Sequence, residues 1–179
     1  RVLRERYGFE TTLLLDATRI DILAGLDRLR ETLTEDDNLL VYYAGHGAID
    51  PDNGRGYWLP VDAEPSDTEA WIANAAITGL VDAIPAKHVL VIADSCFSGT
   101  MTPASVARPL PDMAPELRRR WLRAVTASRV RTALSSGGVR PVIDGTPGAR
   151  HSIFAGAFLE TLRRNGDVLE AYALFLDVQ

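Results

Sequence analysis

The chain has 179 residues, a formal net charge of −5, and 46% hydrophobic and 24% charged residues. That balance is ordinary for a globular protein with one domain, residues 1–179, and the negative charge argues against broad electrostatic binding of nucleic acid. No apolar run approaches the roughly 20 residues that a membrane-spanning helix needs, and a single cysteine cannot form an internal disulfide. We therefore expect a cytoplasmic protein with no role in a membrane.

The first predicted elements are a helix end, a strand and a helix. The chain begins at Arg1 rather than Met, in the last turns of a helix that Gly8 ends, so we expect it to be part of a longer protein. The continuous apolar character of Phe9–Leu15 predicts a buried strand. Thr18 and Asp21 predict a capping box at the start of a helix. That helix has apolar residues three or four positions apart, namely Ile22, Leu26, Leu29 and Leu33.

A second buried strand, Asn38–Ala44, is followed by a polar loop, Ala48–Gly56. The side chains of Asp50, Asp52 and Asn53 suggest a calcium site, but their spacing differs from that of the twelve-residue calcium loop and no terminal Glu is present. An ordinary turn is therefore the favoured interpretation.

The rest of the chain alternates helical and strand patterns. Tyr57–Pro60 predicts a short edge strand or bend, and residues 68–84 predict a helical region that Pro85 ends. Val89–Ala93 predicts the central strand, and the proline-rich residues 101–115 predict an exposed loop. Further patterns predict a basic helix at Glu116–Ser128, a strand at Val130–Ser136, and helices at Ser152–Arg164 and Asp167–Val178. This alternation favours an α/β fold, a three-layer α/β/α sandwich with a mainly parallel central sheet.

Cys96, the only cysteine, stands just past the central strand, after the polar residues Asp94 and Ser95. A lone cysteine is often only a small buried hydrophobic residue. Here its position favours a functional role, because ligands of open α/β sheets bind at the carboxyl ends of strands, where backbone donors also lower the pKa of a thiol.

His46 follows the strand Asn38–Ala44 in the same way, between two glycines that would let a substrate backbone approach closely. If the two strands are neighbours, its imidazole and the thiol of Cys96 face one another at one edge of the sheet. The other histidines, His88 at the opposite end of the central strand and His151 before a helix, are expected to be structural or exposed.

Two motifs carry a family resemblance: Y-Y-A-G-H-G at 42–47 and D-S-C-F-S-G at 94–99. They resemble the paired His and Cys motifs of the caspase-like cysteine peptidases, closer to metacaspases and their bacterial relatives than to animal caspases. Cys96 follows His46 by 50 positions, which is the known caspase spacing and so belongs to the resemblance. The likeness runs from Thr11 through 133–137 to 154–158. It implies a caspase-like fold whose first strand, with part of the substrate pocket, would precede Arg1.

The resemblance implies a thiol protease acting on protein or peptide substrates. Cys96 would attack the peptide carbonyl as a thiolate, and His46 would transfer protons. The N–H groups of Gly47 and Cys96 would form the oxyanion hole. No third catalytic residue is assigned, because in this family a main-chain carbonyl can orient the histidine. No metal or other cofactor is expected, and a calcium requirement is left open.

Asp94 takes the place of an uncharged residue of animal caspases, and by the resemblance its anion selects substrates with Arg or Lys before the scissile bond. The alternative is that Asp94 only caps the turn after Cys96. Ser135 and Ser136, on the strand that runs beside the bound peptide in relatives, are weaker candidates for substrate binding.

A protease that prefers basic residues could also activate itself, as a zymogen, by cleavage after Arg108 or within Arg118–Arg120. One alternative function is a catalytically inactive scaffold or recruitment module that works with other domains of a longer chain. A second is a flavodoxin-like binding domain, which the absence of a Gly-rich phosphate-binding loop after a strand disfavours.

Overall fold

The computed structural model describes residues 1–64, 67–95, 114–136, 151–166, 169 and 171–178. Its central sheet has three parallel strands in the order β1 (Asn38–Ala44), β5 (His88–Asp94) and β6 (Val130–Ser135). The strand predictions for these three segments are confirmed, and the sheet is parallel as expected. The α/β fold class predicted from the alternation of patterns is therefore correct.

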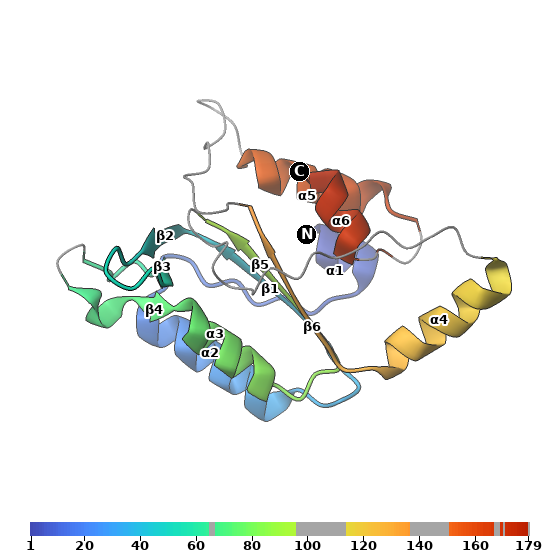
Figure 1. Cartoon of the computed structure of the whole chain (residues 1–179), viewed down its shortest axis with the longest axis horizontal. Helices are drawn as coiled ribbons and strands as arrows, with labels where there is room; N and C mark the ends of the chain where they lie inside the picture. Colours follow the sequence, from blue (N-terminus) through green and yellow to red (C-terminus); the bar gives the residue numbers. More distant parts are fainter. Residues whose placement is uncertain (65–66, 96–113, 137–150, 167–168, 170, 179) are drawn as a thin grey trace.

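Helices cover both faces of this sheet (Figure 1). One face packs against α2 (Arg19–Thr32) and α3 (Asn74–Ala83), and the other against α1 (Val2–Tyr7), α5 (Ile153–Arg164) and α6 (Ala171–Val178). Because side chains alternate along a strand, each face takes every second residue. The α2/α3 face receives Leu39, Val41, Tyr43, Val89, Val91, Ala93 and Ala133, and the α5 face receives Leu40, Tyr42, Leu90, Ile92 and Leu134. The three-layer sandwich is confirmed.

A second, antiparallel sheet lies beyond the end of β1. It consists of β2 (His46–Ile49), β3 (Gly56–Leu59) and β4 (Ile72–Ala73), and a short 3-10 helix, η1 (Thr68–Ala70), precedes β4. The prediction for β3 was wrong in one respect, because this strand is the middle strand of the sheet rather than an edge. Its Trp58 is only 2% exposed. The first residues of the predicted loop also belong to a strand, since β2 continues to Ile49.

The loop between β2 and β3 is an ordinary turn, as predicted. Both carboxylate oxygens of Asp50 are used inside it, one accepting from the Asp52 N–H and the other from the side-chain amide of Asn53. Gly54 has φ 68°, in the left-handed region that glycine adopts at little cost. The polar side chains of this loop therefore stabilise the reversal of the chain between the two strands.

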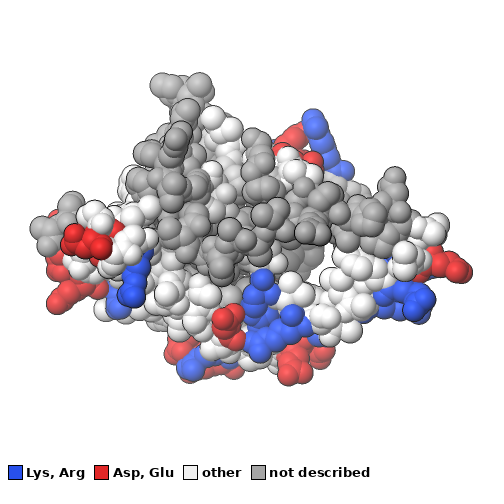
Figure 2. Space-filling view, viewed as in Figure 1, with Lys and Arg blue, Asp and Glu red and all other residues white. Residues whose placement is uncertain are grey.

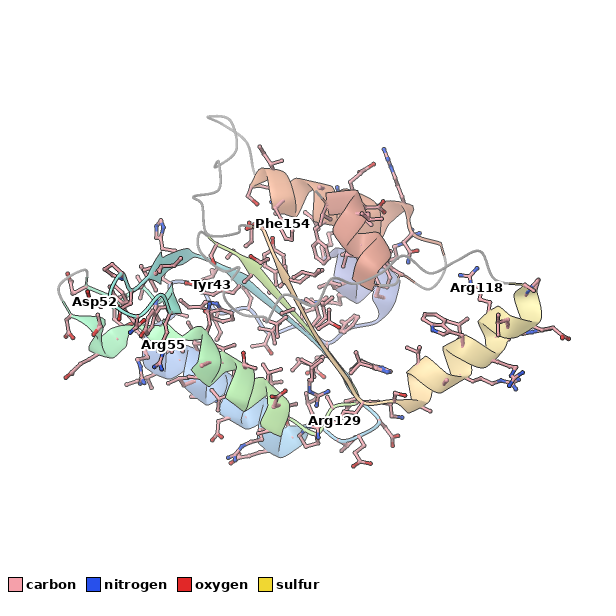
Figure 3. The ribbon with its side chains drawn as sticks, viewed as in Figure 1. Tyr43, Asp52, Arg55, Arg118, Arg129 and Phe154 are labelled. Atoms are coloured by element: carbon pink, nitrogen blue, oxygen red, sulfur yellow. The ribbon has the colours of Figure 1, made fainter. Side chains whose placement is uncertain are left out.

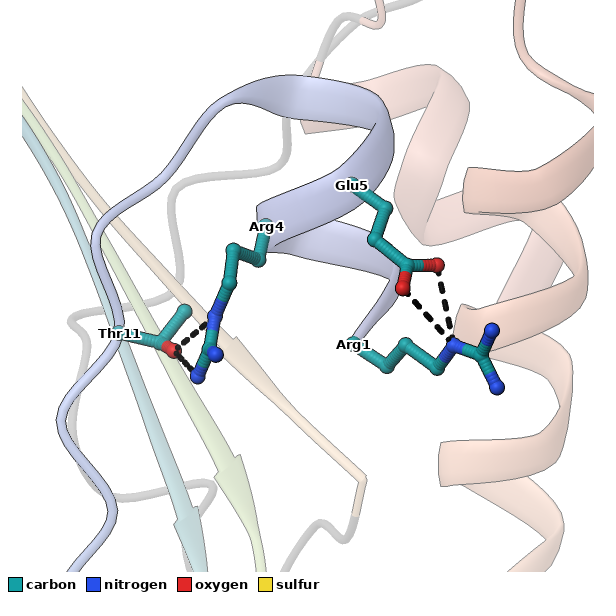
Figure 4. Close-up of polar contacts among 4 residues, drawn as sticks. All are labelled: Arg1, Arg4, Glu5 and Thr11. Carbon is teal, nitrogen blue, oxygen red and sulfur yellow. Dashed lines mark hydrogen bonds and ion pairs between the residues drawn. The ribbon is translucent and has the colours of Figure 1, made fainter.

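The prediction of a strand at Phe9–Leu15 was wrong. The segment is extended but pairs with no described strand, and its leucines 13, 14 and 15 are 77%, 49% and 76% exposed. It is tied to α1 through the Arg4 guanidinium, which donates to the Thr11 hydroxyl at 2.8 Å, while Arg1, the N-cap of α1, pairs with Glu5 of the helix (Figure 4). Apolar character favours burial but does not supply the neighbouring strand that a ladder needs. The expected additional strand before Arg1 stays a prediction.

The helix boundaries follow local signals. Gly8 ends α1 with φ 72°, and the capping box of Thr18 and Asp21 begins α2, both as predicted. The helix α4 (Pro115–Ala127) forms where a basic helix was predicted, whereas residues 101–113 of the predicted loop lie outside the described residues.

The surface shows charges of both signs. Lys and Arg side chains lie beside those of Asp and Glu on the face shown in Figure 2. Within the described ranges, no helix is long and apolar enough to cross a bilayer.

Candidate active site

The strands β1 and β5 are direct neighbours, which confirms the premise of the predicted site. They run parallel with Ala44 opposite Asp94, so both end at the same edge of the sheet. His46 comes two positions after Ala44 in the sequence, and Cys96 comes two positions after Asp94. Cys96 lies outside the described residues, so its distance from the imidazole stays a prediction.

Tyr43 fixes the backbone that carries His46. Its hydroxyl lies 2.7 Å from the carbonyl oxygen of His46 and 3.1 Å from that of Leu59, so it donates to the turn between β1 and β2. Its ring stacks on Trp58 with centroids 4.1 Å apart and planes at 4°. Burial raises the pKa of Tyr43 to about 12, so the hydroxyl stays a protonated donor in alkaline as well as neutral solution. Tyr43 therefore joins β1, β2 and β3 behind the histidine.

Glycine is required at position 45 because Tyr43 fills the space beside it. A Cβ atom on Gly45 would lie 2.6 Å from the Tyr43 hydroxyl oxygen and 2.7 Å from Cζ. The sequence suggested that the glycines beside His46 leave room for a substrate backbone. At Gly45 the structure shows instead that the room is taken by the protein's own tyrosine.

The imidazole of His46 is exposed at the start of β2. Within the described part of the chain, no side chain hydrogen-bonds to this ring. The described residues also contain no group of three or more His, Cys, Asp or Glu side chains arranged to hold a metal ion.

The N–H of Gly47 points away from β3. The Asp50 N–H donates to the Arg55 carbonyl, which marks residues 50 and 55 as a hydrogen-bonded pair of the β2–β3 ladder. Such pairs alternate along an antiparallel ladder, so Gly47 and Trp58 form a pair without hydrogen bonds. The Gly47 amide is therefore not used by the ladder and is directed away from it.

Asp94 lies at the end of β5 with its carboxylate held by two hydroxyl groups. Tyr42 Oη donates to Asp94 Oδ2 at 2.9 Å, and Ser152 Oγ lies 2.5 Å from the same oxygen. Burial, and then the negative charge of Asp94, raises the pKa of Tyr42 well above its usual value, so Tyr42 stays a donor. The turn that Asp94 was alternatively expected to cap lies outside the described residues.

Tyr42 and Ser152 were not among the site residues predicted from the sequence. Alternation along neighbouring strands places Tyr42 on the same face as Asp94, which is a signal that could have been used. No comparable signal exists for Ser152, because it is 58 positions away from Asp94 and meets it only through the packing of α5 on the sheet.

Ser135 and Ser136 lie at the same edge but on opposite faces. Ser135 pairs with Ala93 in the β5–β6 ladder, and the Ser136 N–H continues this ladder by donating to the Ala93 carbonyl at 3.0 Å. Alternation then places only Ser136 on the face of Asp94. Its Oγ is buried and has no partner among the described residues.

Of the two other histidines, His88 lies outside this arrangement, as expected. His88 begins β5 at the opposite end of the sheet, where its ring nitrogens lie 2.7 Å from Asn38 Oδ1 and 3.1 Å from the Val125 carbonyl. It is a structural residue that joins β1, β5 and α4. His151 is exposed and precedes Ser152 at the start of α5.

Comparison with known proteins identifies a family and a similar fold. The family model described as "Caspase domain" matches residues 1–179. The fold is similar to the crystal structure of protein GSU0716 from Geobacter sulfurreducens, with a TM-score of 0.62 and 19% identity over 96% of this chain and 72% of that chain. At that identity the likeness shows a shared fold alone. No curated protein sequence matches this chain.

Proposed function

The chain belongs to the caspase-domain family, and from that premise we propose that it is a cysteine endopeptidase with Cys96 as nucleophile and His46 as the proton-transfer group. The observation that carries the proposal is the register of β1 with β5. It brings the ends of the two strands, from which His46 and Cys96 follow at equal sequence distance, to one edge of the sheet. His88 cannot take this role, because it lies at the opposite end of β5.

The proposed reaction is acyl transfer. The Cys96 thiolate adds to the peptide carbonyl, the tetrahedral intermediate collapses with a proton from His46 to the leaving amine, and water then hydrolyses the thioester. The Gly47 N–H supports an oxyanion hole, because it points away from the β2–β3 ladder. A donor at that place is commonly worth about 3 kcal/mol of transition-state stabilisation. The Cys96 N–H is the second proposed donor.

We propose that the enzyme cleaves proteins after Arg or Lys, as metacaspases do. Asp94 supports this specificity, because its carboxylate stands at the edge of the sheet two positions before the nucleophile. An anion in the first specificity pocket favours a cationic side chain and disfavours an acidic one. Ser136 shares the face of Asp94 and is the better of the two serine candidates.

The proposal is tested with an irreversible electrophile presented on an arginine-containing peptide. We expect labelling of Cys96 in the wild-type chain, slower labelling in Asp94→Asn, and none in His46→Ala, all read by peptide mass spectrometry. His88→Ala serves as the matched control and is expected to label at the wild-type rate. Absence of labelling in the folded wild-type chain would reject the peptidase and favour the scaffold function.

We also propose self-processing in the segment after the nucleophile, with Arg108 as the preferred position. Arg118, Arg119 and Arg120 lie in the regular helix α4, and a protease binds its substrate as an extended peptide. Cleavage there would first require the helix to unfold. Intact-mass measurement should show a cleavage fragment that depends on both Cys96 and Arg108. The absence of a cleavage fragment in both the wild type and Cys96→Ala would contradict self-processing.

The proposed mechanism uses main-chain and side-chain groups alone, so we propose that it needs no metal or other cofactor. Equal peptidase rates in chelator and in added calcium are the expected result. With one cysteine the chain cannot form an internal disulfide, so it does not require an oxidising compartment, and this supports the proposed cytoplasmic location.

A further inference from the structure

We propose that Tyr42 and Ser152 are positioning residues that hold the Asp94 carboxylate for recognition of a basic substrate side chain. This inference rests on the proposed function of Asp94 in a peptidase. It assigns the specificity of the site to a set of three side chains from β1, β5 and the start of α5, rather than to one acidic residue.

The first observation is that both hydroxyls reach the same oxygen. Tyr42 Oη and Ser152 Oγ lie 2.9 Å and 2.5 Å from Asp94 Oδ2. Within the described part of the chain, no donor is directed at Oδ1. Two donors on one carboxylate oxygen fix the rotation of the group and leave its second oxygen to accept from another cation or N–H group.

Each hydroxyl is itself held in place. The ring of Tyr42 packs against Phe158 of α5, with centroids 5.7 Å apart at 31°. Ser152 is the N-cap of α5, and its Oγ accepts from the Ala155 N–H at 2.9 Å. Because that bond uses a lone pair of the oxygen, the hydroxyl proton remains to be donated to Asp94.

The surroundings of Asp94 favour a cation on this face of the sheet. Alternation places Asp94, Tyr42 and Ser136 on the face that α5 covers, and the buried Ser136 Oγ has no partner among the described residues. A basic side chain approaching this face from the edge would meet Asp94 Oδ1, and its N–H groups could also reach the serine hydroxyl. The arrangement therefore offers a carboxylate oxygen and a hydroxyl oxygen as acceptors for the N–H groups of a guanidinium or ammonium group.

A positioning role predicts a loss of selectivity rather than a loss of catalysis. In Tyr42→Phe and in Ser152→Ala the carboxylate keeps its charge but gains freedom to rotate. We expect kcat/KM for an Arg substrate to fall about tenfold in each variant, mostly through KM, because one hydrogen bond to a charged group is lost. The ratio of kcat/KM for Arg over norleucine at the same substrate position should fall with it.

Controls separate this role from simple destabilisation. Thr18→Ala removes the N-cap of a different helix, α2, and should lower thermal stability as Ser152→Ala does while keeping the Arg-to-norleucine ratio. Tyr57→Phe removes the hydroxyl of a tyrosine in β3 whose ring packs against Trp71, and it should also keep the ratio. Ser152→Thr retains a hydroxyl at the cap and should restore most of the selectivity.

Three outcomes are distinguishable. Loss of the selectivity ratio in Tyr42→Phe and Ser152→Ala, with recovery in Ser152→Thr, supports the inference. An unchanged ratio in both variants, alongside a lost ratio in Asp94→Asn, overturns it and leaves the proposed peptidase intact. Absence of any cleavage after basic residues by the wild-type chain, with no labelling of Cys96, overturns both.

Discussion

The two ends of the central sheet use polar side chains in different ways. At the amino end, Arg131 donates to the carbonyls of Lys87 and Ile84 at 3.0 and 2.6 Å, and Arg129 donates to the Ile84 carbonyl at 3.1 Å. His88 bridges β1 and α4 nearby. These side chains satisfy main-chain groups where the strands begin, and Figure 3 shows Arg129 at this end. They explain how the strands are held together and suggest no chemistry.

At the carboxyl end the polar side chains are aligned by other side chains and by a second sheet. Tyr43 fixes the backbone of His46 from the α2/α3 face, and Tyr42 holds Asp94 from the α5 face, where Phe154 also lies (Figure 3). The imidazole remains exposed. The difference shows that position on the sheet, rather than residue type, separates a structural histidine from a candidate catalytic one.

The largest expected effect compares one histidine from each end. His46→Ala should lower kcat/KM about a thousandfold, because general acid–base transfer is lost. His88→Ala should keep activity within about twofold and lower the unfolding midpoint, because its contacts are structural. Steady-state kinetics and urea unfolding on both variants check this. Comparable activity losses in the two variants would remove the distinction between the ends.

Two glycine-to-alanine substitutions test whether the site at the carboxyl end of the sheet depends on close packing. In Gly45→Ala the new methyl group would overlap Tyr43, so the turn carrying His46 must move, and we expect kcat/KM to fall between about ten- and a hundredfold. Gly79→Ala is the control, because a Cβ there meets nothing within 4 Å in the interior of α3. It should stabilise the chain by up to about 1 kcal/mol. Full activity in Gly45→Ala would show that the turn tolerates displacement.

Arg131→Met tests the amino end alone. The guanidinium donates to three main-chain carbonyls, those of Lys87, Val130 and Ile84, and its loss should cost about 2 kcal/mol of the free energy of unfolding. Activity per folded molecule should stay within about twofold. Arg28→Met, on the exposed side of α2, controls for the change of charge and should be nearly neutral in stability. A selective fall in kcat would contradict a purely structural amino end.

The smallest expected effect is an alkaline loss of stability that originates at the carboxyl end. The pKa of Tyr43 is raised by burial to about 12, above its unfolded value of about 10, so its contribution is complete below about pH 10 and is lost as the pH rises towards 12. Tyr43→Phe should flatten this part of the profile. Thermal unfolding across that pH range measures the difference. If the unfolding temperature of Tyr43→Phe fell with pH as steeply as that of the wild type, another group would cause the alkaline loss of stability, and Tyr42 would be the next candidate.

Predictions from local patterns succeeded where the cause is local. The capping box of Thr18 and Asp21, the helix end at Gly8 and the turn around Asp50 each depend on neighbours in sequence, and all three were predicted. The strand predicted at Phe9–Leu15 failed because pairing depends on a partner strand. The edge assignment of β3 failed for the same reason, since its neighbours come from both sides in the sequence.

The sequence by itself determined the helices, the three strands of the central sheet and the two motifs, because hydrophobic period, turn chemistry and residue identity are local properties of the chain. Only the tertiary structure decided that β1 lies beside β5 in register, that Tyr43 fills the space at Gly45, and that Ser152 reaches Asp94. The β1–β5 register and the Ser152 contact join segments far apart in sequence, and the place of the Tyr43 ring depends on its stacking with Trp58 of β3. All three depend on which faces pack together once the chain has collapsed.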